Sequence, residues 1–289
     1  MPRKGWGFAP LALAVVCVSF GSIFARLAQA PPLAVAFYRM SLASLFVAPF
    51  TLRSAAAAVP ALTASRAFLL LASGAALAGH FATWITSLSY TSVAASVLLV
   101  NMAPVFTLLL AWASLGERPT LPLVLAVIVA IGGAAWIATG DSAGGSAPLK
   151  GDLLALAGAV TLSIHHVIGR GLRLALPLGA YLLGAWASAA GVLAALAAGM
   201  GVALAGYPAR TWAAFAALAL VPTILGHGLV NRSLRALPAA AVGLFLLGEP
   251  IGASALAYAL FGEVPSFSTL AGGALVLAAL GLVIVAEAR

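Results

Sequence analysis

Charge is scarce in this chain of 289 residues. Only 7% of the residues are Asp, Glu, Lys or Arg, whereas 64% are hydrophobic. A soluble domain carries roughly 25% charged residues, so this chain has too little polar surface to cover a water-soluble globule. The composition therefore predicts a protein that lies within a membrane.

The sequence also lacks the residue patterns of an enzyme. Its one cysteine, Cys17, excludes an internal disulfide and a cysteine-based metal site. It has no H-E-x-x-H, no G-x-S-x-G and no phosphate-binding loop. Of the six carboxylates, all but Glu249 lie in predicted loops, at span ends or near the C-terminus. We therefore expect no catalytic residues, no metal and no cofactor.

The net charge of +8 could suggest a nucleic-acid partner, but the basic residues are scattered rather than gathered in a patch. They instead set membrane orientation, because cytoplasmic loops are enriched in Lys and Arg. Ten of the 14 basic residues lie on one predicted side and three on the other. This bias predicts cytoplasmic N- and C-termini and argues against nucleic-acid binding.

Apolar runs long enough to cross a bilayer fill almost the whole chain. A span needs about 20 predominantly apolar residues, and charges with Pro or Gly mark the breaks. We predict an all-α polytopic membrane protein with ten transmembrane helices. They cover residues 8–26, 32–52, 66–88, 92–115, 120–140, 151–170, 177–201, 210–231, 238–262 and 267–286.

The chain repeats itself. Pro104, Gly116 and Glu117 recur 146 residues later as Pro250, Gly262 and Glu263. We predict two five-helix repeats, residues 1–145 and 146–289. Because five is odd, the second repeat enters the membrane from the opposite side. Inverted repeats can rock about a site at the midplane and expose it to each side in turn, as secondary transporters do.

Several segments resemble the drug/metabolite transporter superfamily, whose ten-helix members carry two EamA domains. The resembling segments are 20–22, 37–40, 102–107, 115–118, 249–250 and 261–263. Phe20 stands where the superfamily usually has Trp. The resemblance implies a ten-helix carrier, usually an exporter, for amino acids, drugs or other small metabolites. It also implies that spans five and ten pack at the back of the bundle.

Two charges inside predicted spans are candidate functional groups, since charges in a membrane are costly and mark sites. Glu249 precedes Pro250, which deprives the Leu246 carbonyl of its helical donor. Arg39 lies about 11 Å into span two, close to the predicted depth of Glu249. We predict that they form a coupling pair or a structural ion pair, with Glu249 also binding substrate.

Further polar and aromatic residues could line a cavity. His80 and Trp84 are four residues apart on one helix face, and Asn101 lies near the predicted midplane. We add Tyr38 and His165 to the predicted substrate-binding residues. For His80 and Asn101 the alternative is a structural hydrogen bond between helices.

Three residues near span ends are candidate gating groups: Glu117, Glu263 and His227. For Glu117 and Glu263 the alternative is a solvated position at the membrane interface.

The sequence thus predicts a secondary transporter of the bacterial inner membrane that exports small metabolites, with amino acids as the preferred substrate class. Its partners are a small-molecule substrate and the lipid bilayer, and a monomer is expected. Two alternatives are an exporter of lipophilic cations or drugs and a membrane scaffold protein. With no nucleotide-binding domain, transport is expected to run by facilitated diffusion or on an ion gradient.

Overall fold

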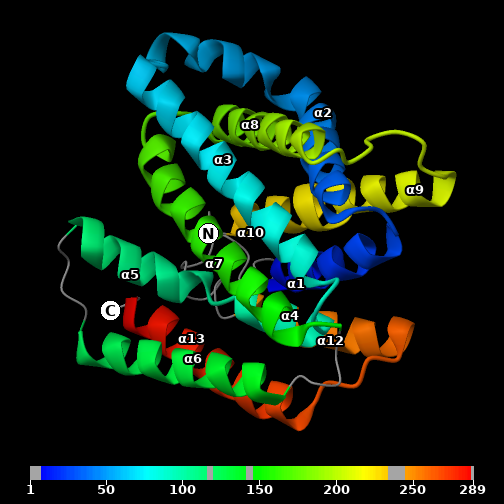
Figure 1. Ribbon diagram of the computed structural model, residues 1–289. Coiled ribbons are helices and arrows are strands. Elements are labelled where there is room, and N and C mark those ends of the chain that lie inside the picture. The colour runs from blue at the N-terminus through cyan, green and yellow to red at the C-terminus, as the bar shows by residue number, and fades with distance from the viewer. Residues whose placement is uncertain (1–7, 116–119, 141–145, 234–244, 288–289) are drawn as a thin grey trace.

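The described part of the protein is helical throughout. The computed structural model describes residues 8–115, 120–140, 146–233 and 245–287, and no strand occurs within these ranges. The helices form one bundle (Figure 1). The first half contains α1 (Phe8–Leu27), α2 (Pro32–Ala58), the short η1 (Val59–Ala61), α3 (Ala64–Ser87), α4 (Val93–Val100), α5 (Ala103–Leu115) and α6 (Leu121–Gly140).

The second half repeats this order. It contains α7 (Pro148–Arg173), α8 (Leu178–Gly199), α9 (Ala209–Leu218), the π-helix η3 (Ala219–Gly226), α10 (His227–Ser233), α12 (Gly248–Phe261) and α13 (Phe267–Glu287). Within the described residues, seven helices are long and apolar enough to cross a membrane, and shorter apolar helices cover residues 93–107 and 124–138. These helices confirm a multi-span membrane protein. The count of ten stays a prediction, because span 238–262 begins outside the described residues.

Contacts between the halves occur in matched pairs. α3 packs along α7, and α9, η3 and α10 pack along α1. α2 packs against α8, and α6 against α13; the last pair forms one edge of the bundle (Figure 1). If the two halves exchange places, the α3–α7 contact becomes the contact of α1 with α9, η3 and α10, and the α2–α8 and α6–α13 pairs map onto themselves. This is the contact pattern that a two-fold relation between the repeats predicts.

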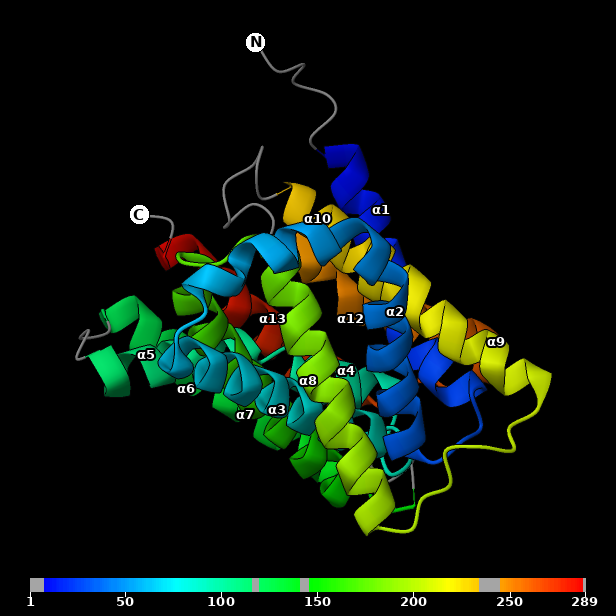
Figure 2. The same ribbon diagram turned by 90° about the horizontal axis from the view of Figure 1, so that it is seen from above.

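The α6–α13 pair is held together by glycines at a close crossing. A Cβ atom on Gly133 would lie 2.7 Å from the Gly272 carbonyl oxygen, and one on Gly272 would lie 2.6 Å from that of Gly133. Only glycine permits this approach, as in other tightly packed membrane helices. Seen from above, α6 and α13 lie apart from α2 and α9 (Figure 2).

The fourth predicted span is broken in the middle. α4 ends at Val100, a turn follows at Asn101 and Met102, and α5 begins one residue before Pro104. Proline fits the first turn of a helix, where no backbone N–H donor is needed. At the equivalent place in the second half, α12 begins at Gly248, just before Glu249 and Pro250.

The eighth span is distorted instead of broken. The π-helix η3 contains Pro222, which cannot donate to the Leu218 carbonyl. The Thr223 hydroxyl donates to that carbonyl at 2.9 Å, so the distortion is locally satisfied. Single π-helical turns often mark functional sites.

Candidate functional site

Arg39 lies buried at the contact between the two halves. Only 3% of it is exposed, and it contacts α3 and η3 from its place on α2. Its Nε donates to Thr223 Oγ1 at 3.0 Å. Its guanidinium carbon lies 4.3 Å from the centre of the Phe81 ring and 5.6 Å from that of Trp84. The cation is therefore held by one hydrogen bond and two aromatic faces.

Glu249 lies within electrostatic reach of Arg39 but does not form a salt bridge with it. Among the described residues the ion pair with N···O within 4.0 Å joins Arg26 and Glu263 instead. The Asn101 side chain lies near Glu249 and donates to the Val97 carbonyl at 2.9 Å. The interrupted fourth span and the start of α12 therefore lie next to each other at Asn101 and Glu249.

His80 and Trp84 stack on each other along α3, with ring centres 5.8 Å apart. Nδ1 of His80 lies 3.0 Å from the carbonyl oxygen of Gly158 on α7. His80 is therefore part of the α3–α7 contact, and it is also within electrostatic reach of Arg39. Trp84 is 4% exposed, and its Nε1 has no hydrogen-bond partner.

His165 belongs to a separate polar network. Its Nδ1 lies 2.9 Å from Ser73 Oγ, and its Nε2 lies 3.3 Å from the Tyr181 hydroxyl. The Ser73 and Tyr181 hydroxyls are 3.0 Å apart. These side chains join α3, α7 and α8 in a closed ring of hydrogen bonds.

The remaining predicted residues are spread over the bundle. The Tyr38 hydroxyl donates to the Leu204 carbonyl, and the Tyr38 ring stacks on Phe215 with centres 4.6 Å apart. His227 begins α10 and is within electrostatic reach of Arg39. Glu117 lies outside the described residues.

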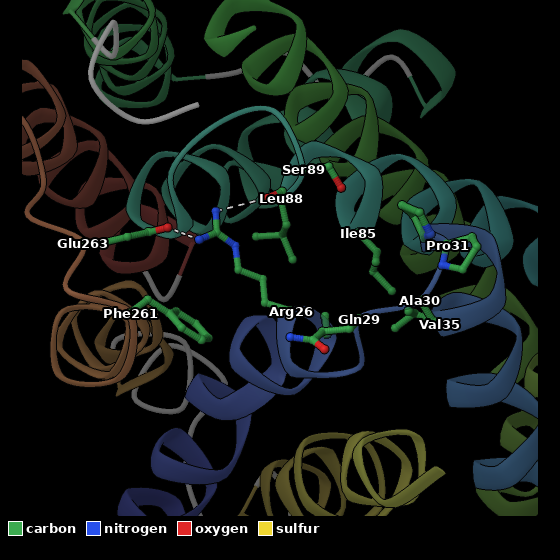
Figure 3. Close-up of a pocket in the computed structure, with 12 residues that line it drawn as sticks. Arg26, Gln29, Ala30, Pro31, Val35, Ile85, Leu88, Ser89, Phe261 and Glu263 are labelled. Carbon is green, nitrogen blue, oxygen red and sulfur yellow. Dashed lines mark hydrogen bonds and ion pairs between the residues drawn. The ribbon is translucent and has the colours of Figure 1, made fainter. Parts of the chain in front are cut away.

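Glu263 forms an ionic contact that joins four segments. It pairs with Arg26 at the end of α1, and its second oxygen accepts from the Val93 backbone N–H at 3.0 Å. Arg26 also donates to the carbonyls of Leu88 and Thr91 at 3.0 and 2.9 Å. Figure 3 shows the guanidinium between Glu263 and Leu88. We call Arg26 and Glu263 the outer pair.

A cavity opens beside the outer pair. Its volume is about 720 Å³, and Gln29, Ile85 and Phe261 are among its lining residues (Figure 3). The Arg26 guanidinium lies 5.8 Å from the centre of the Phe261 ring. The pair therefore forms part of the wall of a polar and apolar cavity at one end of the bundle.

Both halves of the chain match the same known protein family. The model of the EamA-like transporter family matches residues 5–139 and again residues 149–285. The chain belongs to this family. It is therefore a membrane transporter with two EamA repeats.

A curated relative of this EamA protein is named "Probable terminal-alkyne amino-acid exporter" and comes from Streptantibioticus cattleyicolor. The two are 34% identical over 190 residues, which is 64% of this chain and 62% of the relative. A crystal structure of an 18% identical protein matches 96% of this chain and 95% of its own, with a TM-score of 0.65. That likeness shows a shared fold.

Sequence reasoning missed the partners of several groups in this EamA protein. Asp152 is among the carboxylates predicted to lie in loops or at span ends, yet it is 1% exposed and accepts from the Thr91 hydroxyl at 2.8 Å. Nothing in the sequence pairs Arg26 with Glu263, because their positions are 237 residues apart.

Proposed function

We propose that this EamA transporter is a secondary carrier that exports small zwitterionic metabolites, with neutral and aromatic amino acids first. The observation that carries the proposal is the pair of opposite charges, Arg39 and Glu249, that lie inside the bundle within electrostatic reach but not in a salt bridge. An amino acid carries both complementary charges. The name of the 34% identical relative supports the same substrate class.

Glu249 and Asn101 are the proposed contact for the substrate ammonium. Both lie where a membrane helix is interrupted, and interrupted helices supply binding groups at the midplane of many transporters. Trp84, stacked on His80, is the proposed apolar wall for the substrate side chain. The charge of Arg39 disfavours lipophilic cations, which are the competing class.

The outer pair is the proposed closure of the extracellular side. It ties α1 to α12 and to the start of α4, so these elements must separate if the cavity beside it is to open inward. Opening has to break one ion pair and the hydrogen bonds around it. Those contacts are few enough to exchange during a transport cycle.

Transport by purified protein in proteoliposomes tests the function. The panel contains L-phenylalanine, L-leucine, L-propargylglycine and the lipophilic cation tetraphenylphosphonium, with and without a pH gradient. We expect the amino acids to move and the cation not to move. Movement of the cation alone would overturn the amino acid assignment, and movement of none would overturn the carrier.

Glu249→Gln tests coupling. A carboxylate that alternates between a proton and an ammonium makes transport depend on pH, and glutamine cannot take part. We expect the pH dependence of L-phenylalanine counterflow to flatten in this variant. An unchanged pH profile in a folded variant would remove Glu249 as the titrating group.

Membrane orientation is tested by thiol labelling. Cys17 is buried, so it gives a low background for cysteines introduced at Ser89 in one loop and Leu174 in another. For a plasma-membrane protein with cytoplasmic termini, an impermeant maleimide added to intact cells should label Ser89→Cys and not Leu174→Cys. The reverse pattern would overturn this orientation.

A further inference from the structure

Two buried donors near the centre of the bundle have no acceptor. Nη1 of Arg39 and Nε1 of Trp84 are both inaccessible and without a hydrogen-bond partner. Their residues are 3% and 4% exposed, and the guanidinium carbon lies 5.6 Å from the centre of the Trp84 ring. A buried donor without an acceptor costs about 1–3 kcal/mol, and more when it is charged. A buried donor without an acceptor requires an explanation, and a ligand that supplies the acceptor is one.

A glycine on α1 borders Arg39 Nη1 and the Cη2 atom of the Trp84 ring. A Cβ atom built on Gly21 would lie 3.8 Å from Arg39 Nη1 and 3.5 Å from the nearest carbon of Trp84. Those are ordinary contact distances, so a methyl group would fit without displacing its neighbours. Glycine therefore leaves room for about one methyl group beside Arg39 Nη1, which a larger residue would fill.

The side chains that contact Arg39 carry no negative charge that could neutralise it. Thr223, Phe81 and Trp84 contact it, and all three are uncharged. Glu249 is the carboxylate that acts on it, from beyond salt-bridge distance. A fixed cation and a fixed anion separated in this way match the two ends of a zwitterion.

We propose that Arg39 Nη1 and Trp84 Nε1 bind the carboxylate of the transported amino acid while its ammonium faces Glu249. This inference rests on the proposed function and adds to it the requirement for a free carboxylate. Arg39 is then a specificity-determining residue instead of the structural partner of Glu249. The ligand class is an α-amino acid, and decarboxylated amines or amides are excluded.

The first test varies the ligand and leaves the protein unchanged. Counterflow in proteoliposomes is measured with L-phenylalanine, L-phenylalaninamide and phenethylamine, and with L-leucine, L-leucinamide and isoamylamine as a second series. A charge-assisted hydrogen bond should favour each acid over its amide by about tenfold or more. Equal transport of acid and amide would overturn the inference and leave the carrier intact. If neither amino acid moves, the proposed function and the inference both fail.

The second test varies the site. Arg39→Gln should reduce the preference for acid over amide to near one, and Trp84→Phe should reduce it partly by removing Nε1–H. Gly21→Ala should lower the apparent affinity for the acid by filling the space beside Nη1. Gly191→Ala is the matched control, because a Cβ atom there has nothing within 4 Å. An unchanged preference in all three folded site variants would overturn the inference. If Arg39→Gln does not fold, the ligand series and the other two variants decide.

Discussion

Two polar clusters inside the bundle differ in whether their hydrogen-bonding groups have partners. In the network of Ser73, His165 and Tyr181 every side chain has a partner from another helix, at 2.9 to 3.3 Å. Around Arg39, by contrast, the charged Nη1 and the neighbouring Trp84 Nε1 have none. Both clusters join helices of the two halves, so position alone does not explain the difference.

This difference indicates a structural role for the network of Ser73, His165 and Tyr181 and a binding role for Arg39 and Trp84. A satisfied network stabilises the fold and loses stability when one member is removed. A buried charge with an unsatisfied donor costs stability, so its replacement by an apolar residue of similar volume should be tolerated by the fold and felt by the function. This contrast can be measured, because stability and transport are separate readouts for each variant.

The largest effect is expected for Arg39→Met. Methionine fills a similar volume without burying a charge, so thermal stability in detergent should be equal or higher. Counterflow of L-phenylalanine should fall by about tenfold or more, since its carboxylate loses a charged donor. Thermal unfolding followed by fluorescence, together with counterflow, measures both.

Arg26→Met is the control for that change. Arg26 is paired with Glu263, so its removal leaves a carboxylate unpartnered and should lower stability. A loss of stability in Arg39→Met as large as that in Arg26→Met would contradict the contrast.

A smaller effect, on stability alone, is expected for His165→Leu. Two hydroxyls lose an acceptor or donor, which should cost about 1–3 kcal/mol of unfolding free energy. The preference for amino acid over amide should not change. His166→Leu is the neighbouring control, because His166 makes no hydrogen bond within the described ranges. If His165→Leu instead altered ligand preference and kept full stability, the His165 network would be the binding site.

The helices were predictable from hydrophobicity and charge. The predicted bounds of α1 and α13 end within one residue of the observed helices, because lipid requires long apolar segments. The break before Glu249 followed from Pro250, which removes one backbone donor. The break at Asn101 was not expected, although Pro104 is the same signal in the first repeat.

The members of the candidate site were named from the sequence, but their partners were not. Buried charge selected Arg39 and Glu249, and the rule that charges pair then suggested a direct contact. Whether two such groups meet depends on helix rotation and tilt, which a single sequence does not encode locally. The Thr223 contact with Arg39 depends on a π-helical turn, and no residue pattern predicted that turn.

The smallest effect is expected for Thr223→Val, which tests how firmly Arg39 is placed. Valine keeps the shape of threonine but cannot accept from Arg39 Nε or donate to the Leu218 carbonyl. Loss of the hydrogen bond to Arg39, about 1 kcal/mol, should weaken apparent affinity for the amino acid about fivefold. Counterflow at several concentrations separates affinity from maximal rate. Thr211→Val is the matched control, since Thr211 is equally buried and donates to the Ala28 carbonyl at 2.8 Å, away from Arg39. If both variants weakened affinity alike, Thr223 would act through general packing of its helix and not through the orientation of Arg39.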